Sequence, residues 1–121
     1  MTRDDLNLWL SQQARLPAVL GIGLRYADRS SFVQPFTPDL SPNLLDAALH
    51  DVADVFQVLQ LHHLTAGRIR WGFAHMRILA VRRTDGICLG IFTGSGIAET
   101  VMGQVEGLAD LFDQLSTFDQ S

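Results

Sequence analysis

The arginines are the residues whose placement in this sequence first suggests a binding function. Five of the nine basic residues fall within residues 67–83, where no carboxylate occurs, and none of the nine is lysine. That segment carries +5, whereas the rest of the chain has four arginines against thirteen acids, or −9, which gives the net charge of −4. A guanidinium binds carboxylates and phosphates through paired hydrogen bonds. The charge asymmetry therefore predicts a face for an acidic partner or for an acidic surface of a second copy. The five residues are Arg68, Arg70, Arg77, Arg82 and Arg83.

A less specific interpretation explains the same arginines equally well. Charged side chains on the exposed face of an edge strand keep that strand from pairing with other chains. Arg68, Arg70 and Arg77 are the candidates for contact with a partner under the first interpretation, and they form a solvated face under the second. Nucleic acid is not the expected partner, because the chain is acidic overall and few aromatic residues accompany the arginines.

The other residues with chemical potential lack the spacing that catalysis or metal binding requires. The four histidines include no His-x-x-x-His pair, and the single cysteine lies in an apolar run, which predicts an inert, buried thiol. The segment Thr93–Glu99 has neither the third glycine of a dinucleotide fingerprint nor the Gly-Lys-Ser/Thr ending of a phosphate loop, so we interpret it as a helix cap. The acidic pairs Asp51/Asp54 and Asp110/Asp113 are typical of solvated helix faces. The sequence predicts no enzyme, no cofactor and no metal site.

The elements that must position these residues follow from composition and periodicity. With 121 residues, 47% hydrophobic and 18% charged, the chain is expected to form a single domain with a core over about 3–115 and a frayed tail at 116–121. No stretch is long and apolar enough to cross a membrane and the N-terminus does not read as a signal peptide, so a cytoplasmic protein is expected. The patterns predict helices over 3–14, 41–64 and 93–115, and strands within 17–27, 31–36, 67–75, 76–83 and 87–92.

Ser41 is expected to cap the 41–64 helix, and Gly21 and Gly23 mark places where something packs close to the backbone. Asp85-Gly86 predicts a hairpin in which both central positions have a positive φ. The inner row expected for the last helix is Ile97, Val101, Val105, Leu108, Phe112 and Leu115.

These elements predict an α+β fold of the order α-β-β-α-β-β-β-α. A single five-stranded antiparallel sheet, with a long central helix and two flanking helices, is the natural arrangement. In the strand over 67–75, Ile69, Trp71 and Phe73 alternate with Arg68 and Arg70, which predicts one apolar and one basic face.

The central helix over 41–64 is apolar around too much of its circumference for one contact surface. Leu45, Leu49, Val52, Phe56 and Leu59 form one row that faces the core. A helix this apolar needs a second cover, and a chain of this size has few elements left to supply it. The residues that widen the row are Leu44, Ala47, Ala48, Val55, Val58 and Leu61.

The element order resembles that of the roadblock / dynein-light-chain family, in a bacterial or archaeal member. The resemblance covers roughly residues 3–115 and is carried by ILAVRRTDGICLGIF at 78–92, by the GSG-capped helix after it, by LGIGLRYADRSS at 20–31, and by the long helix between the second and third strands. It implies the roadblock fold, which is close to the profilin-like and longin folds.

The resemblance also implies a function. Roadblock-like proteins typically dimerise by pairing their long middle helices and third strands, and many are non-enzymatic scaffolds or regulators of small Ras-like GTPases. A homodimer would supply the second cover of the central helix. The dimer contacts expected on this basis are Ala48, Val55, Val58, Ile69 and Trp71.

Two alternatives remain open from the sequence. A PAS-like sensor domain would bind a small ligand between sheet and helices, which requires a cavity with converging polar groups. A structural subunit of a larger assembly would need neither a ligand nor a GTPase.

Overall fold

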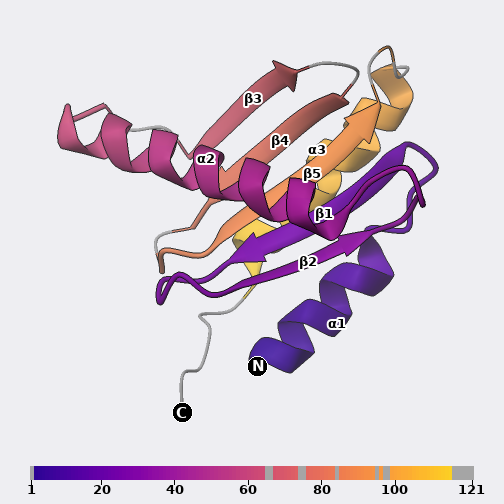
Figure 1. The fold of residues 1–121 in the computed structure, drawn as a ribbon, viewed down its shortest axis with the longest axis horizontal. Helices are drawn as coiled ribbons and strands as arrows, with labels where there is room; N and C mark the ends of the chain where they lie inside the picture. The colour runs from indigo at the N-terminus through magenta and orange to yellow at the C-terminus, as the bar shows by residue number, and fades with distance from the viewer. Residues whose placement is uncertain are drawn as a thin grey trace.

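The computed structural model of the chain describes residues 2–64, 67–73, 76–83, 85–94, 96 and 99–115. Its elements follow the predicted order, with three helices and five strands (Figure 1). They are α1 (Arg3–Gln13), β1 (Val19–Arg25), β2 (Ser31–Pro35), α2 (Pro42–Leu61), β3 (Arg68–Phe73), β4 (Met76–Arg82), β5 (Cys88–Gly94) and α3 (Glu99–Gln114). Among the residues that carried predictions, Ile97, His75 and the tail at 116–121 lie outside the described ranges.

The five strands form one antiparallel sheet in the order β2-β1-β5-β4-β3. The predicted fold class is therefore confirmed. Strands β2 and β3 lie at the two edges of the sheet. Pro35 of β2 has no backbone N–H to donate, and an edge strand tolerates this because no further described strand pairs with its outer side.

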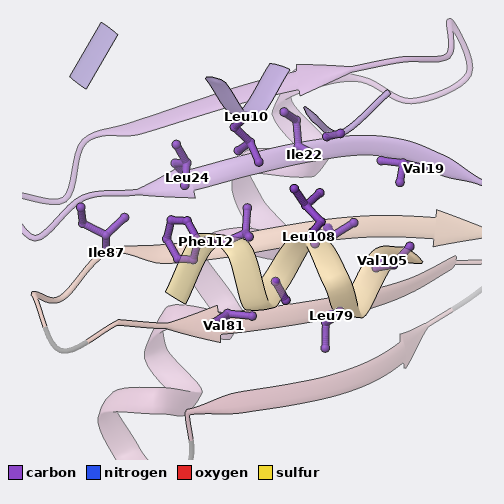
Figure 2. Close-up of a cluster of buried hydrophobic side chains, with 14 of the residues drawn as sticks. Leu10, Val19, Ile22, Leu24, Leu79, Val81, Ile87, Val105, Leu108 and Phe112 are labelled. Carbon is purple, nitrogen blue, oxygen red and sulfur yellow. The ribbon is translucent and has the colours of Figure 1, made fainter. Parts of the chain in front are cut away.

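The helices divide between the two faces of the sheet (Figure 1). Helix α2 crosses one face, and α1 and α3 lie against the other. Beneath α1 and α3, buried side chains of β1, β4 and β5 meet Val105, Leu108 and Phe112 of α3 (Figure 2). Beneath α2, Leu45, Val52 and Phe56 pack on the opposite side of the same strands. The core rows predicted for α2 and α3 are thus confirmed at these positions.

Local sequence determines where α1 and α2 begin. Ser41 precedes α2 and its Oγ accepts a hydrogen bond from the Leu44 N–H at 3.1 Å, while Pro42 occupies the first turn. Thr2 caps α1 and exchanges hydrogen bonds with Asp5 in a capping box. None of the helices within the described ranges is long and apolar enough to cross a membrane.

Two predicted backbone features have different outcomes. The glycines of β1 were expected to mark close packing, and a Cβ at Gly21 or Gly23 would come within 3.0 Å of a leucine of α2. The Asp85-Gly86 hairpin between β4 and β5 is present, but only Gly86 has a positive φ, of 87°. Asp85 instead accepts a hydrogen bond from the Ile87 N–H at 3.2 Å, so of the two positions expected to be left-handed only Gly86 is.

Candidate interaction surface

An apolar groove runs between α2 and the β3 edge of the sheet. Its volume is about 300 Å³. Trp71 of β3 and Ile78 of β4 form one wall and the floor, and one side of α2 forms the other wall. The α2 residues that line it are Leu44, Ala47, Ala48, Asp51 and Val52.

The rim of this groove exposes large apolar side chains. Trp71 is 41% exposed and Leu44 is 43% exposed. Val58, two helical turns beyond Asp51 on the same side of α2, is 52% exposed. Exposed apolar side chains along one surface are typical of protein–protein contact sites.

Helical spacing explains why this side of α2 is left uncovered. Leu45, Leu49, Val52 and Phe56 recur every three or four residues and face the sheet. The groove residues follow a second row of the same spacing, rotated away from the first, and it continues through Val55 and Val58. One sheet can cover only the first row. The sequence predicted that α2 is apolar over more of its circumference than the sheet can cover. The second row of groove residues agrees with that prediction.

The five residues predicted to contact a second copy all lie on the α2 side of the sheet. Ala48 lines the groove, Val55 is half-buried and Val58 is exposed. Ile69 is opposite Ala80 in the register with β4, and Trp71 is opposite Ile78, so both side chains project toward α2. The contact with a second copy stays a prediction.

The outer edge of β3 adds backbone groups to this surface. Strand β3 pairs with β4, and no described strand lies on its other side. The N–H and C=O groups along that edge can therefore extend a ladder onto another strand. The groove and the open edge lie next to each other, which places apolar and hydrogen-bonding surface side by side.

The predicted arginine face lies on the opposite side of β3, as strand alternation requires. Arg68 forms ion pairs with Asp110 at 2.5 Å and with Asp113 at 2.9 Å, both on α3. Arg70 forms an ion pair with Glu106 of α3. These bonds attach the edge strand to the helix behind it.

The charge asymmetry seen in the sequence is thus partly balanced within one chain. The carboxylates of α3 neutralise Arg68 and Arg70, and the side chains of both arginines remain partly exposed. These carboxylates belong to Glu106, Asp110 and Asp113. Arg77 lies opposite Gly72 in the register and is exposed on the same face. Contact of Arg68, Arg70 and Arg77 with a partner stays a prediction.

The remaining two arginines of the cluster point elsewhere. Arg82 lies on the α2 face and donates a hydrogen bond to Gln60 Oε1 at 2.9 Å. Arg83 forms an ion pair with Asp85 at 3.0 Å and stacks on the ring of Phe112. The five arginines therefore do not form one continuous basic surface.

Sequence reasoning missed several groove residues. Leu44, Ala47, Asp51 and Ile78 line the groove and were not among the predicted contacts. The signal for the helical ones was present, because Leu44 and Asp51 lie four and three residues from Ala48, and Ala47 lies three residues from Leu44. Ile78 could not be found this way, since its place depends on the register between β3 and β4.

The single cysteine is buried in β5. Burial raises the pKa of the Cys88 thiol, against the opposing effect of the Arg82 and Arg25 charges, so the thiol stays protonated at neutral pH. Within the described ranges, no three His, Cys, Asp or Glu side chains gather to hold a metal ion.

Comparison with known proteins yields structural neighbours only. No family model matches the chain, and no curated protein matches it either. MglB of Myxococcus xanthus superposes with a TM-score of 0.64 at 11% identity, covering 94% of this chain and 96% of that one. The gliding protein MglB of Thermus thermophilus gives 0.63 at 10% identity, covering 91% and 84%. A Roadblock/LC7 domain from Streptomyces avermitilis gives 0.55 at 16% identity, covering 85% and 91%. The chain has the roadblock fold, as its sequence pattern predicted.

Proposed function

We propose that this chain is a non-enzymatic regulatory or scaffold protein that acts as a homodimer and binds a small Ras-like GTPase. One observation carries the proposal: an apolar groove on α2 lies beside an open sheet edge, on a chain with the roadblock fold. A groove of this kind is suited to bind protein surface rather than to carry out a reaction.

A homodimer would cover the exposed surface of α2 and β3. Two copies related by a two-fold axis would place α2 against α2 and β3 against β3. The exposed Val58 and Trp71 would then be covered, and the open edge of β3 would be paired. The dimer would act in the cytoplasm, where small GTPases operate.

The GTPase is the partner that the roadblock resemblance implies. The arginine face and the acidic α3 lie on the side of the sheet away from α2. They would therefore stay accessible in the dimer. Arg77, exposed there, is a candidate contact for the acidic surface of a partner.

The test is direct binding to a GTPase. The purified chain is titrated, by calorimetry, with small Ras-like GTPases encoded in its own genome, each loaded with GDP or with a non-hydrolysable GTP analogue. The proposal predicts saturable binding of one of them, with a preference between the two nucleotide states. If none of the GTPases binds in either state, the partner part of the proposal is wrong.

Regulation is separated from scaffolding by the hydrolysis rate. A regulator changes the rate at which the bound GTPase hydrolyses GTP, whereas a scaffold binds without changing it. Replacement of Arg77 with glutamate should weaken binding in either case, and replacement of the exposed Leu8 on α1 with glutamine serves as the control.

A further inference from the structure

A second pocket lies under the other side of α2, away from the groove. Its volume is about 410 Å³. His50, Asp54 and Gln57 of α2 recur every three or four residues and face it, so it lies along a third row of the helix. The ends of β1, β4 and β5 form its floor, where Arg25, Cys88 and Arg82 line it.

Strand register places two arginines side by side on this floor. Arg25 of β1 and Arg82 of β4 are both opposite Cys88 of β5. The two arginines are therefore neighbours of the same small residue on the same face, with backbones about 10 Å apart. Both side chains reach α2, since Arg25 contacts His50 and Arg82 bonds to Gln60.

Arg25 is buried, and no carboxylate among the described residues pairs with it. Only 9% of the Arg25 surface is exposed, and its Nη2 atom lies 3.4 Å from Nε2 of His50. In the part of the chain that the structure describes, no carboxylate forms an ion pair with Arg25 or Arg82. A buried, uncompensated charge is costly, and proteins ordinarily neutralise it with a counter-charge.

The wider lining strengthens the positive character of the pocket. Arg29 adds a third guanidinium at the exposed β1–β2 turn. Asp54 is the single carboxylate among the lining residues, and it lies on the exposed surface of α2. The two glutamines, Gln57 and Gln60, supply neutral donors and acceptors.

We propose that this pocket binds a small oxyanion, such as a phosphate monoester or a carboxylate, between Arg25 and Arg82 with His50 as a third contact. Both guanidinium groups line one pocket from two strands, and guanidinium is the side chain best suited to bind an oxyanion through paired hydrogen bonds. The site is recessed beneath α2 and has room for more than the anion itself, which favours a small molecule over a protein side chain. Bound there, the anion would supply the counter-charge that Arg25 lacks.

The experiment measures anion binding to the whole purified chain. Inorganic phosphate, citrate and chloride are compared at equal ionic strength, by calorimetry and by the midpoint of thermal unfolding. We expect phosphate or citrate to bind one site per chain and to raise the midpoint, while chloride does neither. The tighter of the two anions identifies phosphate or carboxylate as the preferred group.

Variants separate the site from general charge effects. Arg25→Gln and Arg82→Gln should each weaken binding roughly 10- to 100-fold, because each removes a charge-assisted hydrogen bond. Arg77→Gln removes an arginine of the same strand as Arg82 from the opposite face and should leave the affinity unchanged.

Three outcomes would overturn the proposal. They are the absence of phosphate or citrate binding to the natural chain, an equal loss of affinity in the Arg77 control, and undiminished affinity in Arg82→Gln. If Arg25→Gln fails to fold, Arg82→Gln decides the matter alone. This proposal does not rest on the dimer, because the pocket and the groove lie on different sides of α2.

Discussion

At the scale of single residues, Tyr26 shows how local burial determines a measurable property. It is the chain's one tyrosine. Its ring is buried, its hydroxyl donates a hydrogen bond to Asn7 Oδ1 at 2.6 Å, and the Arg3 guanidinium lies 4.4 Å from the ring centroid. These contacts join α1 to the end of β1.

Burial raises the pKa of Tyr26 to about 12 from its ordinary 10.0, although the Arg3 charge acts in the opposite direction. Because the folded pKa is the higher one, this tyrosine's contribution to stability is fully present below pH 10 and is lost as the pH rises through about 12. The absorbance of the phenolate reports this residue alone. We predict a midpoint near 12 in the folded protein and near 10.0 in denaturant. A folded midpoint equal to the denatured one would contradict the packing described for Tyr26.

At the scale of elements, the closeness of α2 to the sheet depends on glycines. A Cβ at Gly23 would lie 3.0 Å from Leu49 Cδ2 and 3.3 Å from Val33 Cγ1. The pattern of the sequence indicated close packing at Gly21 and Gly23, but the helix responsible could not be identified from sequence, because that contact depends on the tertiary fold.

Substitution of Gly23 by valine should force α2 away from β1. We expect the free energy of unfolding to fall by about 1–3 kcal/mol, as for other overpacked cores. Chemical denaturation measures the change. Gly72→Val is the matched control, since nothing lies within 4 Å of a Cβ there, and its stability should be unchanged or slightly higher. Equal losses in both variants would mean that the approach of α2 to β1 does not determine the effect.

The ion pairs between β3 and α3 lie on the surface and should contribute little to stability. Both partners in each pair are at least a third exposed. We therefore predict that Arg68→Gln lowers the free energy of unfolding by no more than about 1 kcal/mol, and that high salt removes the difference. Denaturation curves at low and high salt check this. A loss of several kcal/mol that salt does not change would show that Arg68 supports the edge strand in another way.

The sequence predicted the order of the elements better than the roles of their side chains. The rows of α2 and α3, the cap at Ser41 and the alternation in β3 are local patterns, and the structure confirms them. The contacts of Arg68 and Arg70 with their own α3 could not be predicted, because they join residues more than thirty positions apart. The same holds for Arg25 and Arg82, which become neighbours only through Cys88 of β5.

At the scale of the whole molecule, α2 has three sides with different surroundings. One side packs on the sheet, one lines the apolar groove, and one covers the pocket with two arginines on its floor. The proposed dimer uses the second side and the proposed anion site uses the third. Changes confined to one of them should leave the other intact.

The central claim is that a second copy of the chain covers the groove, and the mass of the particle in solution tests it most directly. Size-exclusion chromatography with light scattering is applied to the natural chain, to Val58→Asp and to Leu8→Asp. Val58 and Leu8 are exposed to a similar extent, at 52% and 59%, but only Val58 lies beside the groove. We predict dimers for the natural chain and for Leu8→Asp, and a monomer with an unchanged circular dichroism spectrum for Val58→Asp. A natural chain that is monomeric at micromolar concentration, or a Val58→Asp variant that stays dimeric, would contradict the claim.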